Sequence, residues 1–563
     1  MDRINLYLLQ NLGFNLKQLI IAFSLIVVLS IVIYCLIAFK NRLISLGILI
    51  LIIGILAFTY SQIFINVVCL YILLPSLVLG SLAGLYSLPD TVNFPWDASF
   101  KVVKKGLIDK DTRVIKNLRR GTLILGSAGS GKTESPIYSI MKRLAEAEFS
   151  GVLYDFKDFE LTEIAQPLFE ERLKIVAIHK PHLSARINPL SSKYISDVKD
   201  INEVVSVLVD NLGSDAKSDF FKENAEALLT SIILKLHLND KRDRTSFCTL
   251  PHVVAIILNI DFSEIVGTDK FGETIIEPYA KLKRFLTADT MVKTQASAFL
   301  GGLSSEKQTA AVFSTLANLL RKIAIEEAFY VLGADELDLA VNKHENDIVI
   351  SVVSEPKNNK FLSPINATII HTITKQMMVR NRKQSFVLLD EAPTIKLKNM
   401  AQLPATMRSF GVCIIYCMQD LSQGIMQYGR DGIKEITSNL STQFFGKTND
   451  GETSKYYESF FGTKNIKTFS KSFKGGGGGM FGSISGSTEG EREISEVRAI
   501  EFFKLKSGQF AFFADGKGEI IQFQRNKIIR EEIDKNKISL SDKYKLNYEN
   551  IVRDAQRIID AKH

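Results

Sequence analysis

The stretch "GSAGSGKT" at residues 126–133 constrains the fold more than any other part of the chain. It follows the apolar run from Leu123 to Leu125 and precedes a helical pattern, and it fits GxxxxGK[ST] at every fixed position. Its small residues let backbone N–H groups curl around phosphates, while Lys132 reaches the β and γ oxygens and Thr133 binds Mg²⁺. The stretch therefore predicts a phosphate-binding loop in an α/β protein, with nucleotide contacts at Gly126, Ser127, Ala128, Gly129, Ser130, Gly131, Lys132 and Thr133.

One residue disturbs the helix that should follow the loop. Pro136 falls early in that helix and has no N–H to donate. The sequence therefore predicts a kink in the first turns.

A second element has the character needed to hold a metal ion. The stretch "SFVLLDEAP" at residues 385–393 is a short apolar run that ends in two carboxylates, which is typical of a buried parallel strand. We expect Asp390 to bind Mg²⁺ through water and Glu391 to polarise the attacking water. An ordinary strand end with two acids is the alternative, which the phosphate loop makes the weaker interpretation.

A third strand follows in "GVCIIYCMQDLSQ" at residues 411–423. Its apolar residues lead to Gln419, and a polar side chain at the C-terminal edge of such a sheet lies where ligands bind. Gln419 is expected to sense the γ-phosphate or position the water, although a solvated glutamine at a strand end is the alternative.

The sequence also bears on the nucleotide and the metal. No NKxD guanine motif is present, since "KTND" at 447–450 has the wrong order, and no LSGGQ-like signature occurs. ATP with Mg²⁺ is therefore favoured over GTP. The five cysteines form no CxxC pair and the seven histidines form no HExxH or HxxxH cluster, so neither a disulfide framework nor a protein-bound transition metal is expected.

The N-terminal part has the composition of a membrane anchor. Long uncharged apolar runs predict three transmembrane spans near residues 18–39, 43–59 and 64–86. The "KNR" between the first two should face the cytoplasm, which places the N-terminus outside and the large C-terminal part in the cytoplasm with ATP. Two spans with the N-terminus inside remain an alternative, as do buried core helices. The net charge of +8 permits a nucleic-acid or lipid partner without requiring one.

Several further stretches resemble one family, the TraG/TraD coupling proteins of type IV secretion and bacterial conjugation. "ARINPL" at 185–190 is similar to that family's Asn-Pro-Leu landmark, and "FFKENAEALLTSIILKL" at 220–236 resembles the entry to its helical domain, continued by "LPHVVAII" from Leu250. The strongest block, 390–429, holds the two acids followed by the family's spacing of Arg408, Gly411, Gln419, Gln423, Tyr428 and Gly429.

One stretch resembles the family with departures. "LYDFKDFE" at 153–160 is similar to the family's strand with Asp-Pro-Lys-Gly-Glu, but Phe156 and Asp158 replace the proline and glycine, and Glu160 comes one place late. The whole resemblance covers about residues 115 to 525.

The resemblance implies a fold and a mode of action. The expected fold is a RecA-like P-loop NTPase core of the α/β class with an inserted all-helical domain and an N-terminal transmembrane anchor. Such a protein works as a homo-hexamer at the bacterial inner membrane, where it brings a relaxase–DNA complex or a secreted protein to the type IV secretion channel by hydrolysing ATP. Arg408 is implied as an arginine finger on the neighbour's ATP, with a salt-bridged Arg408 as the alternative.

These considerations divide the chain into successive parts. We expect a transmembrane anchor at 1–89, the two parts of the ATPase domain at 90–195 and 341–525, an all-helical domain at 196–340, a flexible glycine-rich loop at 475–487 and a charged helical tail at 526–563.

Three other functions compete with this interpretation. An FtsK-type translocase for double-stranded DNA would share anchor and motor but needs a DNA-reading domain, for which the tail looks too short. A coupling ATPase for effector proteins alone is not excluded by the sequence. A membrane scaffold with a vestigial nucleotide site is disfavoured by the intact Lys132, Thr133, Asp390 and Glu391.

Overall fold

The computed structural model describes part of the chain. The described residues are 94–104, 111–213, 219–268, 270–303, 305–473, 484–535 and 541–561, with 75, 76 and 78 farther upstream. The predicted transmembrane spans lie outside these residues, apart from those three positions. Among the helices so described, none is long and apolar enough to cross a membrane.

The chain divides into two compact units, residues 1–93 with 99–114, and residues 94–98 with 115–563. Strands β1 (Ala98–Lys101) and β2 (Thr112–Ile115), which pair as a small sheet, fall largely in the first unit. The second unit holds every other strand and helix described below.

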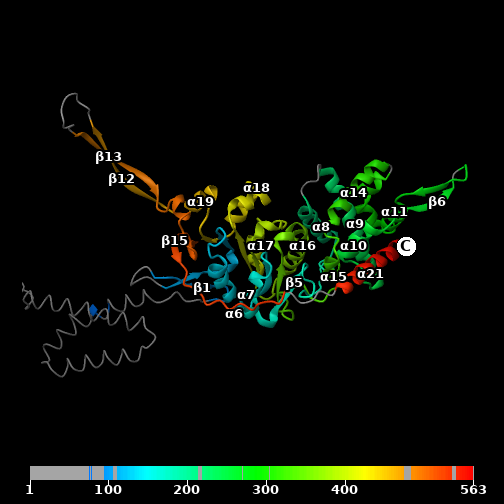
Figure 1. Cartoon of the computed structure of the whole chain (residues 1–563), viewed down its shortest axis with the longest axis horizontal. Coiled ribbons are helices and arrows are strands. Elements are labelled where there is room, and N and C mark those ends of the chain that lie inside the picture. Colours follow the sequence, from blue (N-terminus) through cyan, green and yellow to red (C-terminus); the bar gives the residue numbers. More distant parts are fainter. Residues whose placement is uncertain are drawn as a thin grey trace, which may run out of the picture. The chain divides into compact units, whose positions relative to one another are not determined.

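The second unit is built on a nine-stranded sheet in the order β15-β14-β11-β3-β10-β9-β4-β8-β5. Figure 1 labels its two edge strands, β15 and β5. The strands from β11 to β5 are parallel, while β14 and β15 are antiparallel at the other edge. This large mixed sheet confirms the predicted α/β class. The strands are β3 (Thr122–Leu125), β4 (Ser150–Asp155), β5 (Leu173–Ala177), β8 (Val349–Val353), β9 (Ser385–Leu389), β10 (Val412–Met418), β11 (Thr442–Phe445), β14 (Gln509–Ala514) and β15 (Lys517–Gln522).

The register of the central strands places their carboxyl ends at one edge of the sheet. Leu125 at the end of β3 pairs with Met418 at the end of β10, and Leu389 at the end of β9 pairs with Tyr154 of β4. These strands are buried along their whole length, because apolar residues face both sides of the sheet. The residues that follow these strands therefore lie at the same edge of the sheet.

The helix that follows the phosphate loop begins with a π-helical turn, Thr133–Ile137, and continues as α6 (Tyr138–Glu146). Pro136 has no N–H for the Lys132 carbonyl, and the Ile137 N–H bonds that oxygen instead at 3.1 Å. The predicted disturbance of the first turns is thus confirmed, as a π-turn.

Further helices flank the sheet and connect its strands. Helix α7 packs on β4, β5 and β8, α16 packs on β4 and β8, and both α17 and α18 contact β10. Their bounds are α7 (Glu160–Phe169), α16 (Asn359–Met377), α17 (Leu403–Met407), α18 (Leu421–Ser438), α19 (Gly451–Glu458) and α20 (Ala499–Phe502).

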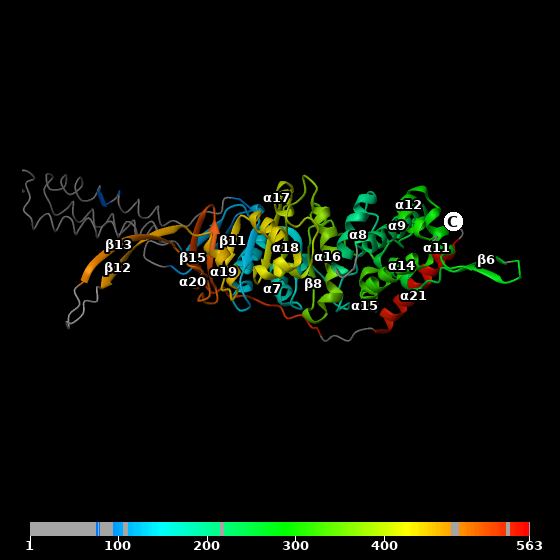
Figure 2. The ribbon, with the colours of Figure 1, turned by 90° about the horizontal axis from the view of Figure 1, so that it is seen from above.

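A group of helices is inserted between β5 and β8, beside the β5 end of the sheet (Figures 1 and 2). Asn188 of the "NPL" stretch is buried at its entrance, where its amide donates to the Cys248 carbonyl at 3.0 Å and its oxygen accepts from the Leu190 N–H at 3.0 Å. The helices are α8 (Val198–Leu212), α9 (Asp219–Asp243), α10 (Leu250–Asn259), α11 (Ala280–Thr287), α12 (Thr290–Gln295), α13 (Ser297–Gly302), α14 (Glu306–Arg321) and α15 (Glu326–Leu332).

This inserted part is not all-helical, contrary to the expectation for 196–340. A hairpin of β6 (Glu264–Thr268) and β7 (Thr274–Glu277) extends from it. Its β-branched residues, such as Val266 and Ile276, favour extended backbone, and its turn contains Gly272 at φ 85°.

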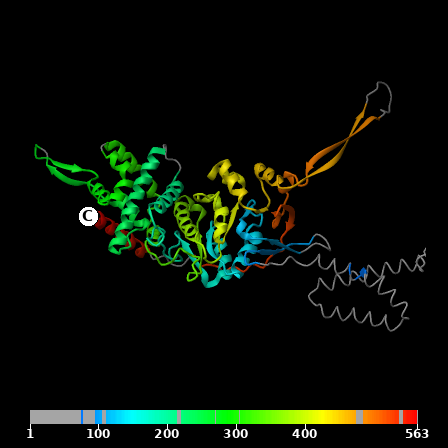
Figure 3. The same ribbon diagram turned by 180° about the vertical axis from the view of Figure 1, so that it is seen from behind.

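The C-terminal helix α21 (Ser541–Asp560) packs on α10 and α15 of the inserted part (Figure 3). Its stripe buries Ile551, Ala555 and Ile559, and the Tyr548 ring lies 4.5 Å from that of Phe329. The apolar stripe of this helix is therefore covered by the protein itself, and the helix predicted for the tail is present over Ser541–Asp560.

The glycine-rich stretch connects two long paired strands, β12 (Thr463–Phe473) and β13 (Ile484–Ser495). Residues 475–483 of the predicted flexible loop lie outside the described residues. The remainder of that prediction is wrong, because residues 484–487 pair with β12. The strand that follows the glycines is β13, since serine and threonine beside the glycines accept extended backbone when a partner strand is present.

The docking of α21 predicts a local stability difference. Ile559 is fully buried, so Ile559→Ala should destabilise the contact of α21 by about 2–4 kcal/mol. Hydrogen exchange of the α21 amides should therefore accelerate. Leu546→Ala on the same helix is the control, since Leu546 is 56% exposed, and equal exchange in the two variants would contradict the packing.

Candidate functional site

The loop at 126–133 is held by backbone hydrogen bonds to neighbouring segments. The Ser127 N–H donates to the Lys447 carbonyl at 2.7 Å, and the Gly508 N–H donates to the Ser130 carbonyl at 2.9 Å. Gly129 and Gly131 have φ of 77° and 89°, a region that favours glycine. A Cβ on Gly131 would lie 2.8 Å from the Gly508 nitrogen, so a larger residue does not fit there.

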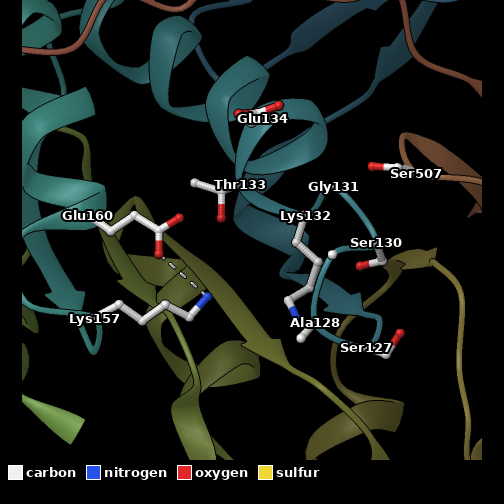
Figure 4. Close-up of a pocket in the computed structure, with 11 residues that line it drawn as sticks. Ser127, Ala128, Ser130, Gly131, Lys132, Thr133, Glu134, Lys157, Glu160 and Ser507 are labelled. Carbon is white, nitrogen blue, oxygen red and sulfur yellow. Dashed lines mark ion pairs between the residues drawn. The ribbon is translucent and has the colours of Figure 1, made fainter.

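The loop encloses a cavity of about 280 Å³ (Figure 4). Polar groups dominate its wall, and backbone N–H groups, two ammonium groups and a hydroxyl are available to an anion and its counter-ion. The lining residues are Ser127, Ala128, Gly129, Ser130, Gly131, Lys132, Thr133, Glu134, Lys157, Glu160 and Ser507. Every predicted nucleotide contact except Gly126 is among them.

Lys132 is buried inside the loop that it belongs to. Its ammonium donates to the Gly126 carbonyl and lies 3.8 Å from Glu391 Oε1. The side chain is only 6% exposed, so these oxygens and not water are the groups that its ammonium contacts.

The predicted acids lie directly beyond β9, at the same sheet edge. Asp390 and Glu391 are both buried, and Gln419 donates from Nε2 to Glu391 Oε1 at 3.0 Å. Glu391 has φ 53°, a strained conformation for a non-glycine residue that is typical of functional turns. The structure thus brings Lys132, Glu391 and Gln419 into one cluster.

Burial acts strongly on Asp390. Desolvation raises the pKa of its carboxyl to about 7, with Glu391 and Asp155 acting in the same direction and Lys157 and Lys132 opposing them. The group therefore changes charge near neutral pH in the absence of a bound cation.

The acids fit a hard cation. Asp390 Oδ1 and Glu391 Oε2 are buried and have no hydrogen-bond partner, which leaves two oxygens for such an ion. Thr133 adds a hydroxyl at the cavity wall. Within the described part of the chain no group of three His, Cys, Asp or Glu side chains is arranged to hold a metal, so a Mg²⁺ site here also needs oxygens from a ligand.

The loop after β4 contributes groups to which the sequence analysis gave no role. Lys157 and Glu160 line the cavity, with Lys157 Nζ 3.8 Å from Glu160 Oε2. Burial opposes the charge of Lys157, but the carboxylates of Asp390, Glu160 and Glu391 outweigh it and raise its pKa. The signal was present in "DFKDFE", where charged residues directly follow an apolar strand.

Arg408 does not join the cluster. It is exposed and precedes β10, so it lies at the amino edge of the sheet, whereas the loop lies at the carboxyl edge. The length of β10 separates the two edges by roughly 20 Å. The structure therefore brings together the predicted catalytic residues Glu391 and Gln419 but not Arg408 of the same chain.

Comparison with known proteins places this geometry in context. The family model described as "TraM recognition site of TraD and TraG" matches residues 385–503, which include both acids, Arg408 and Gln419. The predicted resemblance to the TraG/TraD coupling proteins is confirmed. No curated protein matches the sequence of the chain.

Solved structures of a coupling protein share the fold. The bacterial conjugative coupling protein TrwBdeltaN70 is 13% identical with a TM-score of 0.55, over 74% of this chain and 87% of that one. TrwB with the ATP analogue ADPNP is 11% identical with a TM-score of 0.55, over 74% and 87%. TrwB with ADP and Mg²⁺ is also 11% identical with a TM-score of 0.55, over 77% and 95%.

The raised pKa of Asp390 predicts a pH-dependent stability effect in this TraG/TraD-like chain. The folded state binds this proton more tightly than the unfolded state, so the stabilising contribution present at low pH is lost as pH rises through about 7. In EDTA at pH 8, Asp390→Asn should therefore raise the free energy of unfolding by about 2–4 kcal/mol.

The difference between Asp390→Asn and the unmodified chain should be smaller at pH 5, where the folded carboxyl is neutral, and should vanish only below the ordinary pKa of 3.8, where the carboxyl is neutral in the unfolded chain as well. Chemical unfolding of the full chain at the two pH values measures it. A variant that is destabilised at pH 8 would contradict the assigned burial.

Proposed function

We propose that the chain is a membrane-anchored ATPase that couples a relaxase–DNA complex, or a secreted protein, to a type IV secretion channel. One observation carries the proposal: Lys132, Glu391 and Gln419 converge at the carboxyl edge of a parallel sheet, beside a glycine-rich loop, in a chain that resembles the TraG/TraD proteins. A RecA-like motor core is the fold that this arrangement supports.

Each group has a role in this proposal. The N–H groups of the loop and the Lys132 ammonium bind the β- and γ-phosphates, which requires Lys132 to leave the Gly126 carbonyl. Thr133 and Asp390 hold Mg²⁺, which supplies charge neutralisation when bound. Glu391 accepts a proton from the attacking water at its carboxylate, and Gln419 orients that carboxylate through their hydrogen bond.

The comparisons support nucleotide binding, but they do not bear on coupling to a secretion channel. The similar protein TrwB has been solved with ADPNP and with ADP and Mg²⁺. The cavity of about 280 Å³ and the two unpartnered carboxylate oxygens are compatible with a triphosphate and its metal. Preference for ATP over GTP rests on the missing guanine motif.

Anchoring, partners and assembly are further parts of the proposal. The apolar N-terminal runs support a multi-pass anchor in the bacterial inner membrane with the catalytic part in the cytoplasm. The family model matched over 385–503 is described as a recognition site for TraM, which supports a protein partner for this part of the chain. A coupling ATPase for proteins alone therefore remains the second candidate.

Assembly as a homo-hexamer would give Arg408 a target. Arg408 lies at the edge of the sheet away from its own loop, so it can act as an arginine finger only on the nucleotide of a neighbouring subunit. Such a finger is typically worth about 10³–10⁵ in rate.

Substitution of the loop lysine should abolish ATP hydrolysis. Lys132→Ala removes the cation that grips the phosphates, so ATP turnover should fall to background while membrane insertion persists. Turnover by the full chain in detergent and relaxase-dependent plasmid transfer in cells are the measurements. Transfer of protein without DNA would select the second candidate, and full turnover in Lys132→Ala would refute the ATPase itself.

A mixing experiment tests the role of Arg408. Arg408→Ala should lower kcat about 1,000-fold with little effect on nucleotide affinity. Mixing it with inactive Lys132→Ala should restore part of the activity, because each variant supplies what the other lacks. If mixed samples remain as inactive as either variant alone, Arg408 does not act between subunits.

A further inference from the structure

A second ammonium group faces the cavity from the side opposite the loop. Lys157 lies on the turn after β4, across the cavity from Lys132, and Figure 4 shows its ammonium and the Thr133 hydroxyl pointing into the same space. The sheet order β3-β10-β9-β4 explains this placement, because β9 with its two acids lies between Lys157 and the strand that carries the loop.

The turn that carries Lys157 is held rigidly by a buried carboxylate. Asp155 is fully buried and accepts from the N–H groups of Lys157 at 3.1 Å, Leu161 at 3.0 Å and Thr162 at 2.8 Å. The Thr162 hydroxyl donates to the same carboxylate at 2.6 Å. A network of this kind fixes the backbone from which the lysine projects.

Two residues with positive φ complete the turn. Asp158 at φ 48° has its carboxylate 2.9 Å from His179 Nε2, and Phe159 at φ 74° is fully buried. Non-glycine residues persist in this conformation only where the surroundings hold them, which is common at ligand sites. The turn is therefore built to present its side chains and not merely to connect β4 to α7.

The Lys157 ammonium forms a loose ion pair and not a hydrogen bond with Glu160. Its Nζ lies 3.8 Å from Glu160 Oε2, which is beyond hydrogen-bond distance. Its side chain is 35% exposed, in contrast with the buried Lys132. The group can therefore turn toward an anion in the cavity without breaking a hydrogen bond to Glu160.

We propose that Lys157 is a second phosphate-binding cation, which contacts the terminal phosphate of the bound nucleoside triphosphate. The inference rests on the proposed function. Bound Mg²⁺ would be held by Thr133 and Asp390 and would neutralise charge on the terminal phosphates, so the end of the phosphate chain would lie toward Asp390. Lys157 stands on that side, where the carboxylates of Asp390 and Glu391 act on its charge.

The role of Lys157 differs from that of Lys132. Lys132 belongs to the loop and meets β- and γ-phosphates alike, whereas Lys157 reaches only the terminal group. It thus distinguishes the triphosphate from the diphosphate, and it supplies within one subunit the positive charge that Arg408 cannot bring to its own site.

Nucleotide binding by the full chain in detergent tests this role. With Mg²⁺ present, Lys157→Met should weaken binding of a non-hydrolysable ATP analogue about 10-fold or more, because a charge-assisted hydrogen bond is lost. The Kd for ADP should stay within about twofold, since ADP has no terminal phosphate to contact. Lys157→Arg should retain most of the preference for the triphosphate.

Two control variants separate phosphate binding from structural effects. Lys142 on α6 has a comparable glutamate, Glu146, 3.9 Å away but does not line the cavity, so Lys142→Ala should leave both affinities unchanged. Leu546→Ala on the exposed face of α21, which does not line the cavity, should likewise leave both affinities unchanged.

Three results would overturn the inference: equal loss of analogue and ADP affinity in Lys157→Met, no loss of either, or the same loss in Lys142→Ala. These are distinct from failure of the proposed function. If the unmodified chain binds neither nucleotide, the nucleotide site itself is wrong and the inference falls with it. The same holds if Lys132→Ala binds both nucleotides as tightly as the unmodified chain.

Discussion

The in-register parallel pairing of β3, β10, β9 and β4 is the constraint on which the site depends. Because these strands end together, the residues that follow them meet at one edge although they are far apart in sequence. The Tyr154 carbonyl of β4 accepts from the Asp390 N–H at 3.1 Å, which holds the first residue beyond β9 against the neighbouring strand. A shift of one residue in the pairing of β9 would turn its buried side chains to the other face of the sheet.

The same alignment of strands brings several buried carboxylates together, and the partners present in the structure satisfy them only in part. Asp155, Asp390 and Glu391 are buried near one another, and two lysines face them. Asp155 is satisfied by its own turn, whereas Asp390 Oδ1 and Glu391 Oε2 have no partner. Buried oxygens left in this state destabilise the fold unless something binds them, which is why they point to a ligand rather than to a structural role.

The site is also connected to the inserted helices through the chain that follows β15. Arg530 pairs with Glu134 at the cavity wall at 3.2 Å, and Lys535 pairs with Glu163 of α7 at 3.2 Å. Beyond this segment α21 packs on α10 and α15. The described residues after β15 therefore contact the cavity wall and α7, and farther along the chain α21 packs on the inserted part.

The sequence by itself determined the local chemistry. The glycine spacing around Lys132, the acids after an apolar run and Pro136 at the start of a helix each specify a backbone conformation or a ligand type within a few residues, and the structure has a loop, a strand end and a π-turn at these places. The paired strands flanking the glycine-rich stretch and the β6–β7 hairpin were missed, because pairing depends on a partner strand that local pattern does not reveal. Only the tertiary structure decided which groups face the cavity. Lys157 faces it and Arg408 does not, because strand order and strand direction fix the edge of the sheet at which each side chain lies, and neither can be read from spacing along the chain.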